Sequence, residues 1–304
     1  MRNLLFVVIL FFIIPLTGYG QYGSDFGVSL GGSSYLGEFG GGEGEGRGFI
    51  ADMDISSTRP NFNVFYRKKV SPKFSLKGAL SYISLSGDDS KSKNPPRRAR
   101  NLNFKNNLIE LLATAEWYLY RSNDVARTGR YGVDFNLYVF TGVGAFYSNP
   151  KGQIDSTGQW VSLRNLKSEG VSYSPINIAI PLGIGFYYTF DRRYRIGMEA
   201  GFRGTLTDYI DDISSTYAND YDGITNKTSQ ELLDEINAEY YPEETGLLVT
   251  NFDAGSPRGN NKSNDSYLII TASFSITIGS GKNNYRRPRG SGYKRTRRPR
   301  RSRF

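Results

Sequence analysis

The chain has 304 residues, among them 38 Lys and Arg and 29 Asp and Glu, so its formal net charge is +9. Cys and His are both absent, which excludes disulfides, thiolate or imidazole metal sites, cysteine nucleophiles and His-dependent catalytic pairs. A mechanism built on carboxylates, Lys or Tyr stays open. The 35 glycines and the 14% aromatic content favour a fold rich in β-strands.

Residues 1–20 have the pattern of a secretory signal peptide. Arg2 supplies the positive charge, residues 4–16 form the apolar run, and Gly18 and Gly20 are the small residues before a predicted cleavage site. We expect an exported protein, with an uncleaved anchor as the less favoured alternative. No Cys follows the apolar run, which argues against a lipoprotein, and no later segment has the length of a transmembrane helix. The periplasm, the exterior and the outer membrane remain as locations.

Beyond residue 20, apolar residues recur with a period of two, which indicates strands and not helices. The last segment shows this best, because every second residue from Leu268 to Ile278 is apolar. Pro181 interrupts another strand and cannot donate to a ladder, so we expect a bulge or distorted pairing there. We predict eight strands, over residues 24–36, 61–69, 73–85, 108–120, 134–147, 176–190, 194–207 and 267–278.

The connections between these strands alternate in length. Residues 70–73 and 191–193 form short turns, and 121–133 is intermediate. The other connections are long, over residues 37–60, 86–103, 148–175 and 208–265. Long loops on one side and shorter turns on the other are typical of outer-membrane barrels. The predicted fold class is therefore all-β: an eight-stranded antiparallel transmembrane β-barrel with long extracellular loops and short periplasmic turns.

Opposite the apolar face, these strands have a second face that carries charged residues. The direction of this face distinguishes a membrane barrel from a soluble one. A membrane barrel turns its charged face inward and a soluble barrel turns it outward. We predict that a charge network of Arg67, Lys77, Glu110, Glu116, Arg195, Glu199 and Arg203 fills the barrel interior. Aromatic residues near strand ends should form interfacial girdles; they are Tyr35, Tyr82, Trp117, Tyr120, Tyr147, Tyr194 and Tyr209. A soluble lipocalin-like barrel or sandwich remains the alternative.

Candidate chemistry is sparse in this sequence. The carboxylate pairs Asp88-Asp89 and Asp211-Asp212 are interpreted as solvated acids at loop tips, because adjacent residues on a strand point to opposite faces. No motif indicates a cofactor or a metal site, and the glycine-rich run 40–48 is interpreted as a flexible loop. Residues 228–240 have a capping-box spacing and an apolar stripe, and they predict a short helix within the last long loop.

The positive charge is concentrated at the end of the chain. Removing Arg2 and residues 279–304 leaves 26 basic residues against 29 acidic ones. We expect three regions: a signal peptide at 1–20, the barrel at 21–278, and a disordered tail at 279–304 on the periplasmic side. The tail should bind an acidic periplasmic surface, either a protein partner or lipid headgroups, or it acts only as a solubilising extension. Nucleic acid is not an expected partner. The candidate partner-binding residues of the tail are Arg286, Arg287, Arg289, Lys294, Arg295, Arg297, Arg298, Arg300, Arg301 and Arg303.

Six stretches in a fixed order also carry a family resemblance. They are residues 31–38, 100–104, 138–144, 180–185, 207–214 and 258–260. Together they resemble the PorG-like outer-membrane β-barrel family of Bacteroidota, whose named members belong to the type IX secretion system. The resemblance covers residues 24–278. It implies an integral outer-membrane barrel without enzyme activity that associates with a periplasmic ring of a lipoprotein and its partner protein. The arginine-rich tail departs from the family pattern.

The leading hypothesis is a non-enzymatic outer-membrane barrel that serves as an anchor or accessory of a secretion apparatus. Its partners would be outer-membrane lipid and periplasmic secretion-ring proteins. A surface receptor or adhesin that binds ligands through the long loops is the first alternative. An enzyme comes third, because His is absent. An open pore is disfavoured, because eight strands leave little lumen.

Overall fold

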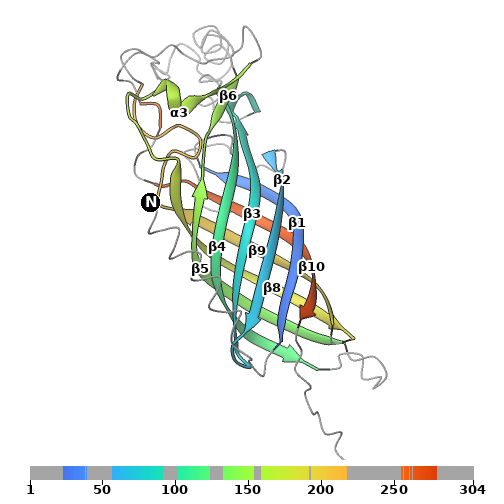
Figure 1. The fold of residues 1–304 in the computed structure, drawn as a ribbon. Helices are drawn as coiled ribbons and strands as arrows, with labels where there is room; N and C mark the ends of the chain where they lie inside the picture. The colour runs from blue at the N-terminus through green and yellow to red at the C-terminus, as the bar shows by residue number, and fades with distance from the viewer. Residues whose placement is uncertain are drawn as a thin grey trace, which may run out of the picture.

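The structure, a computed structural model, describes residues 23–37, 39, 57–91, 102–123, 133–153, 159–191, 193–217, 255, 257–259, 261 and 263–278. Eight long strands in this part form one closed antiparallel barrel (Figure 1). The strands are β1 (Ser24–Leu36), β2 (Arg59–Lys69), β3 (Phe74–Asp88), β4 (Asn103–Ser122), β5 (Asp134–Tyr147), β8 (Ile176–Phe190), β9 (Tyr194–Thr205) and β10 (Ser266–Ile278).

Each long strand pairs with its neighbours in the chain. The pairing of the first strand, β1, with the last, β10, joins the two ends of this sequence of strands and closes the ring. The predicted fold class, an eight-stranded antiparallel barrel, is confirmed. Strand edges are unsatisfied rows of N–H and C=O groups, and closure of the ring removes them. Among the described residues, no helix is long and apolar enough to cross a membrane.

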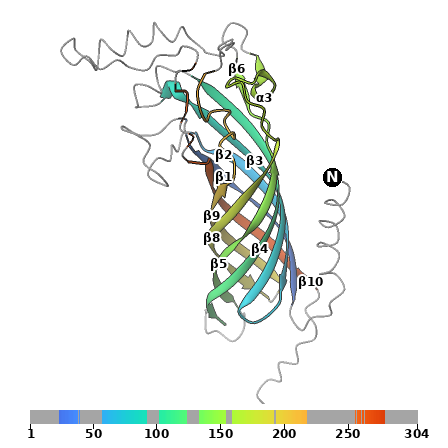
Figure 2. The same cartoon turned by 90° about the vertical axis from the view of Figure 1, so that its left-hand side faces the viewer.

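The two ends of the barrel differ. The turn end holds the start of β1, the end of β10 and the connections β2–β3, β4–β5 and β8–β9 (Figure 2). The loop end holds the other four connections. There the structure adds a short hairpin, β6 (Lys151–Gln153) and β7 (Trp160–Ser162), followed by the helix α3 (Leu163–Leu166). A 3-10 turn, η4 (Asp89–Lys91), follows β3.

Several strand bounds differ from the sequence-based ones. β4 begins at Asn103 and not at 108, and β3 continues to Asp88, because these two segments pair residue by residue up to Gly87↔Phe104 and Asp88↔Asn103. The sequence did not indicate this extension, because residues 103–107 are mostly polar. Phe104 and Asn106 are buried, and the polar residues that alternate with them are not. β9 ends two residues early, at Thr205.

The irregularity expected near Pro181 is confirmed. β5 and β8 pair at Thr141↔Leu182 and again at Gly144↔Ala179, with no pairs between them, while Pro181 still faces Arg203 on β9. The Thr141 hydroxyl donates to the Pro181 carbonyl oxygen at 2.9 Å. A separate bulge lies between Tyr118 and Tyr120 on β4, where the register to β5 shifts by one residue.

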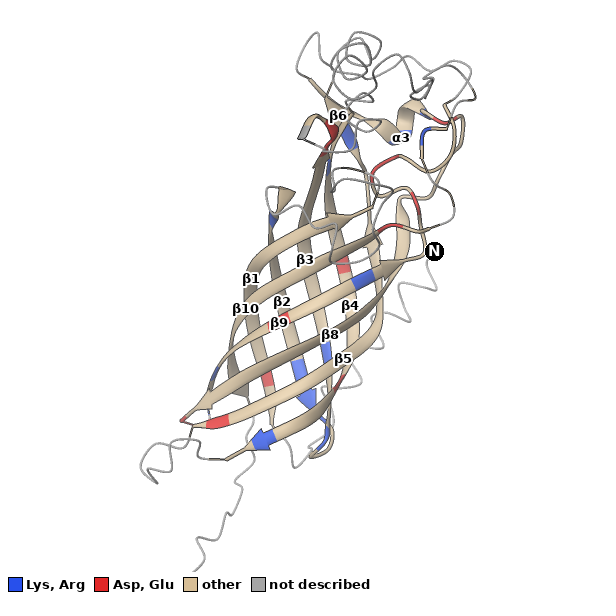
Figure 3. Cartoon of the chain, turned by 180° about the vertical axis from the view of Figure 1, so that it is seen from behind, with Lys and Arg blue, Asp and Glu red and all other residues tan. Residues whose placement is uncertain are grey.

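The outside of the barrel wall is apolar, and the charged side chains of the strands' central parts face the interior. Figure 3 shows that the barrel strands are mostly tan, with isolated blue and red positions along them. Leu30 is 63% exposed and Leu182 is 62% exposed on the outer wall. Large side chains of the same kind cover every long strand on its outward face, including Phe62, Leu80, Ile109, Val143, Ile184, Ile196 and Ile270.

Most of the predicted girdle aromatics lie on this outer wall. Tyr82, Trp117, Tyr120, Tyr147 and Tyr194 are all exposed, and the Phe74 and Trp117 rings stack at 5.9 Å near the turn end. The prediction for Tyr35 is wrong, because its side chain points inward and is buried. Tyr35 belongs to the inward-facing odd positions of β1, so strand parity overrides its place near the strand end. Tyr209 stacks on Tyr173 in the loop region and is also not part of a girdle.

Candidate functional site

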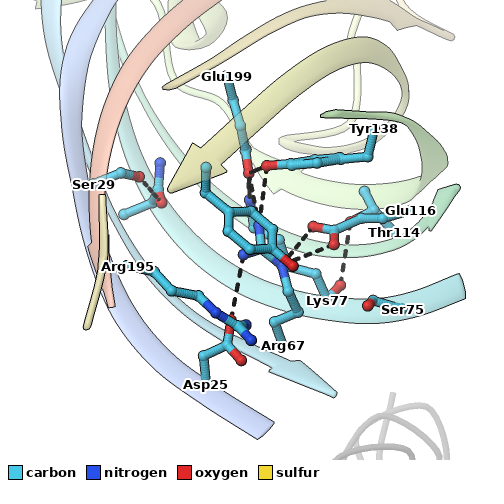
Figure 4. Close-up of polar contacts among 12 residues, drawn as sticks. Asp25, Ser29, Arg67, Ser75, Lys77, Thr114, Glu116, Tyr138, Arg195 and Glu199 are labelled. Atoms are coloured by element: carbon cyan, nitrogen blue, oxygen red, sulfur yellow. Dashed lines mark hydrogen bonds and ion pairs between the residues drawn. The ribbon is translucent and has the colours of Figure 1, made fainter. Parts of the chain in front are cut away.

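In the half of the barrel interior nearer the turn end, the charged side chains gather around Arg67 on β2 (Figure 4). Its Nε lies 2.8 Å from Glu116 Oε2. Its Nη1 lies 3.4 Å from Asp25 Oδ2 and its Nη2 lies 3.1 Å from Glu199 Oε1. Arg67 thus joins carboxylates from β1, β4 and β9. A guanidinium suits this task because its donors lie in a rigid planar fork.

Two further cations complete the Arg67 network, which we define as Asp25, Arg67, Lys77, Glu116, Arg195 and Glu199. Lys77 Nζ lies 2.5 Å from Glu199 Oε2, and Arg195 forms an ion pair with Asp25. The network therefore holds three cations and three carboxylates, so its formal charge is zero. Balanced partners are essential here, because an isolated buried charge is strongly destabilising.

Aromatic rings surround the central guanidinium. The Arg67 Cζ atom lies 4.9 Å from the Tyr187 ring centroid, 5.3 Å from that of Tyr138 and 5.4 Å from that of Phe65. The Tyr138 hydroxyl also donates to Glu199 at 2.5 Å. Cation–π contacts are strongest where water is excluded. The rings therefore fill the lumen and stabilise the charge at the same time.

Nearer the loop end of the barrel, a second ion pair joins β4 and β9. Arg203 Nε lies 3.5 Å from Glu110 Oε1, and the Tyr267 hydroxyl donates to the same oxygen at 3.1 Å. The Arg203 guanidinium also lies 5.9 Å from the Phe140 ring centroid. Gly201 leaves room for this arrangement, because a Cβ there would lie 2.5 Å from Arg203 Nη1.

The structure places all seven sequence-predicted charges on the inner face. Arg67, Lys77, Glu116, Arg195 and Glu199 meet in the Arg67 network, whereas Glu110 and Arg203 form the separate pair above it. Sequence reasoning missed Asp25. The available signal was strand parity, since Asp25 alternates with the apolar outward residues Phe26 and Val28 on β1.

The loop end of the barrel is closed by an apolar plug. Ile210 and Ile213, from the connection after β9, are fully buried. They share a core with inward side chains of the upper barrel: Ile83, Leu85, Phe104, Leu108 and Phe146. Asn106 on β4 holds the plug, because its amide donates to the Ile210 carbonyl oxygen at 2.6 Å and to the Ser148 hydroxyl at 2.7 Å.

A carboxyl cluster links the plug to the first strand. The Tyr35 hydroxyl lies 2.6 Å from Asp211 Oδ2 and also contacts Asp265 Oδ1. A phenol has one proton to donate, so two carboxyl contacts require that one carboxyl of this trio carries a proton. Backbone N–H groups bind the remaining oxygens, from Ile213 to Asp211 and from Ile210 to Asp265.

A second polar cluster joins the two longest described loops. The Arg258 Nη1 group donates to Glu169 Oε1 at 3.2 Å and to the Ser168 hydroxyl at 2.9 Å. Its Nη2 lies 3.5 Å from Asp212 Oδ2. Glu169 also accepts from the backbone N–H groups of Ser214 and Ser215, both at 2.9 Å. One buried ion cluster thus fixes the β5–β8 loop against the β9–β10 loop.

The interpretation of the aspartate pairs as solvated acids is wrong for three of the four residues. Asp211, Asp212 and Asp89 are buried, while Asp88 is half-buried and binds the Ser90 backbone and hydroxyl. Asp211 and Asp212 lie in loop backbone with bends, and Asp212 has a φ of 71°. The alternation rule of an extended strand does not apply there, so both carboxyls point into protein.

Burial raises the pKa of two carboxyls in the loop between β9 and β10. Burial raises the pKa of Asp208 from 3.8 to about 7, with Asp211 and Glu169 adding to the rise and Ser214 opposing it. Burial also raises the pKa of Asp265 well above its usual value, and the neighbouring Asp211 charge adds to this. The raised pKa of Asp265 favours its protonated form, which is in line with the single proton that the Tyr35 hydroxyl can donate.

Other sequence predictions fall on residues that the structure does not describe. They are the signal peptide at 1–20, the glycine-rich run at 40–48, the helix at 228–240 and the basic tail at 279–304. Within the described ranges, no group of three or more acidic side chains is arranged to hold a metal ion.

Several solved structures resemble this fold at low sequence identity. The attachment invasion locus protein Ail of Yersinia pestis, with a heparin analogue, is 10% identical and covers 84% of this chain and 99% of its own, with a TM-score of 0.34. Neisserial surface protein A is 8% identical, covers 85% and 98%, and has a TM-score of 0.35. OprG from Pseudomonas aeruginosa is 8% identical, covers 85% and 96%, and has a TM-score of 0.33.

Curated protein sequences give no match to this chain. A family model does match, over residues 2–230. That range includes the first seven barrel strands and the plug residues Ile210 and Ile213. The family is described as a domain of unknown function, DUF6089. Since the match covers well over half of the chain, the protein belongs to the DUF6089 family.

Proposed function

We propose that this protein is a non-enzymatic, integral outer-membrane barrel that serves as an anchor or accessory of a protein secretion apparatus. The observation that carries this proposal is the filled interior. The Arg67 network, the Glu110–Arg203 pair and the apolar plug occupy the lumen from the turn end to the loop end. A barrel filled in this way offers a rigid body for attachment and no wide passage.

The outer wall supports the membrane location. In water, exposed apolar side chains on every long strand would be strongly unfavourable, whereas in lipid they are the favoured surface. Inward charges and outward apolar residues are the arrangement of outer-membrane barrels. With the usual orientation of such barrels, the loop end faces the exterior and the turn end faces the periplasm. The end of β10, after which the basic tail begins in the sequence, then lies on the periplasmic side.

The resemblance to the PorG-like family supports the link to type IX secretion. That family implies contact with a periplasmic ring, and the eleven Lys and Arg residues of the tail would give such a contact an electrostatic component. Binding of the tail to anionic lipid headgroups is the competing use of the same charge. The two uses differ in whether a protein partner co-purifies.

Fractionation and co-purification test the proposal together. A tagged full-length protein should fractionate with the outer membrane and should migrate differently on gels before and after boiling, as folded barrels do. Extraction in mild detergent should recover periplasmic ring proteins at low salt. Deletion of residues 282–304 should reduce that recovery and leave the barrel in the membrane. Recovery in the soluble fraction would contradict the membrane location, and unchanged partner recovery would contradict the role of the tail.

A receptor role is the second candidate, and one observation favours it. The loop end carries a fixed platform, because Arg258, Glu169 and Asp212 join two loops in one buried cluster. On it, the half-buried rings of Tyr173 and Tyr209 stack at 4.5 Å with an interplanar angle of 9°. Tyr173→Ala should abolish surface ligand capture by whole cells if the receptor role holds, and should leave ring co-purification unchanged.

A further inference from the structure

We propose that the outer wall of the barrel carries a phosphate-binding site for outer-leaflet lipid, formed by Lys105 and Lys151 beside Trp160. The inference rests on the proposed membrane location and orientation. It adds a lipid ligand of defined chemistry to them. Figure 3 shows blue Lys and Arg positions at the loop end near β6, where these strands meet.

The two lysines are direct cross-strand partners. Lys105 on β4 pairs with Lys151 on β6, and this pair is the register contact between the two strands. Facing Cα atoms in an antiparallel pair are about 5 Å apart, so both side chains leave the sheet on the same face. Like charges in this position repel each other. A bound anion offsets that repulsion, so anion binding at this pair is electrostatically favourable.

The ammonium groups keep most of their donors free for a ligand. Both side chains are exposed, and no ion pair to an acid is formed by either lysine among the described residues. Lys105 Nζ lies 4.0 Å from the Trp160 ring centroid. That cation–π contact fixes the direction of the ammonium group and uses none of its three N–H donors in a conventional hydrogen bond.

The height of the pair on the wall points to lipid headgroups. Ile109 is exposed on β4 and lies in register between Tyr82 on β3 and Tyr147 on β5. Exposed tyrosines of this kind mark the membrane interface. Lys105 lies four residues beyond Ile109 on the same outward face, about 13 Å along the strand at ~3.3 Å per residue. This is the level at which headgroup phosphates lie above an apolar wall.

Trp160 supports the same level and supplies a readout. An indole is amphipathic and favours the interface between hydrocarbon and water. Asp88, the outward residue of β3 beyond Ser86, binds Ser90 through its Oδ1, and Ser86 is the β3 partner of Lys105. The outward surface here combines two facing cations, an aromatic ring and an apolar wall below, with the Asp88 carboxylate at the next outward position of β3. The cations, the ring and the wall match the phosphate, sugar and acyl parts of a phosphorylated glycolipid.

Lipid titration of the purified full chain tests the site. The folded barrel in neutral detergent micelles is titrated with bisphosphorylated lipid A, with the dephosphorylated form and with inorganic phosphate. Trp117→Phe leaves Trp160 as the remaining tryptophan, so its fluorescence reports binding. We expect the bisphosphorylated lipid to bind at least tenfold more tightly than the dephosphorylated one. The double variant Lys105→Gln with Lys151→Gln should lose that difference, whereas Lys68→Gln with Lys73→Gln at the turn end should keep it.

Each outcome bears on a separate claim. Equal binding of both lipids, or an unchanged preference in the Lys105 and Lys151 double variant, would overturn the site. Saturable binding of inorganic phosphate at the same concentrations would overturn the lipid assignment in favour of a free phosphate site. Insertion into phospholipid vesicles is measured in parallel on the same sample. Failure to insert contradicts the membrane location itself, and insertion without phosphate selectivity contradicts only this inference.

Discussion

The Tyr35 hydroxyl lies 2.6 Å from the carboxylate of Asp211, although the two residues are 176 positions apart in the chain. One ends the first strand and the other lies in the loop after β9. The contact exists because β1 and β9 both flank β10, so their loop ends rise beside each other. It ties the plug directly to the barrel wall.

Protonation of this plug should make its stability depend on pH. The pKa of Asp208 is raised from 3.8 to about 7, so the folded plug binds a proton more tightly than the open loop does. Its stability should be highest below about pH 4, fall as the pH rises toward 7, and level off above that value. Hydrogen exchange at the Ile210 and Ile213 amides should therefore be slower at pH 5 than at pH 8, after correction for intrinsic rates.

Asp208→Asn should flatten this dependence, because the amide does not titrate. Asp191→Asn, in the exposed turn between β8 and β9, is the matched control and should leave the profile unchanged. A plug that exchanges more slowly at pH 8 than at pH 5 would contradict the raised pKa of the buried carboxyls.

Loss of the central cation should destabilise the whole barrel. Arg67→Met leaves Glu116, Asp25 and Glu199 with too few partners in a buried site. Removing one member of a buried ion network costs about 3–5 kcal/mol. Urea unfolding in detergent or lipid, followed by gel mobility, should show this loss. Lys68→Met, one residue away on the outward face, should change stability by less than about 1 kcal/mol.

A double variant separates charge from packing in the same network. Arg67→Met combined with Glu116→Gln removes one charge of each sign and should recover part of the lost stability, because an apolar or neutral replacement of a buried pair is better tolerated than a half-broken pair. If the double variant is as unstable as the sum of the two single variants, ion pairing does not explain the role of Arg67.

Cutting the link between the loops should loosen the platform and spare the barrel. Arg258→Met removes the cation that joins Glu169 on one loop to Asp212 on the other. We expect faster proteolysis within residues 163–175 and 206–217 and unchanged heat-dependent gel mobility. Lys167→Met removes an exposed charge from the same region and should alter neither result. A global loss of barrel folding in Arg258→Met would contradict a local role for this cluster.

Close backbone approach should make one glycine irreplaceable. A Cβ at Gly142 on β5 would lie 2.0 Å from the Ala113 carbonyl oxygen and 2.7 Å from the Thr114 Cα, both backbone atoms that cannot move aside. Gly142→Ala should destabilise the barrel by about 1–3 kcal/mol, the usual range for overpacking. Gly204→Ala is the control, since its nearest neighbours are 3.5 Å and 4.0 Å away. Equal stability of both variants would contradict the steric assignment.

The eight strands and the inward direction of seven charged side chains follow from residue order alone. Strand geometry repeats every two residues, so alternation fixes which face Arg67, Glu116 and Glu199 occupy before any partner is known. The same parity would have placed Asp25 and Tyr35 inside. Only the closed ring decides which inward charges meet, because that depends on the register between strands that are far apart in the chain.

The buried contacts of the plug could not be predicted from the periodicity of the sequence. Asp211 and Asp212 lie in irregular loop backbone, where each side chain direction depends on individual φ and ψ angles and not on a repeat. Both residues are buried because the neighbouring Ile210 and Ile213 pack into the apolar core at the loop end of the barrel. Their carboxyls there contact Tyr35 and Arg258, which lie far away in the sequence. Sequence determined the wall and its two faces through local geometry. Tertiary structure decided the contacts inside it, because charge pairing and packing are set by the three-dimensional neighbours.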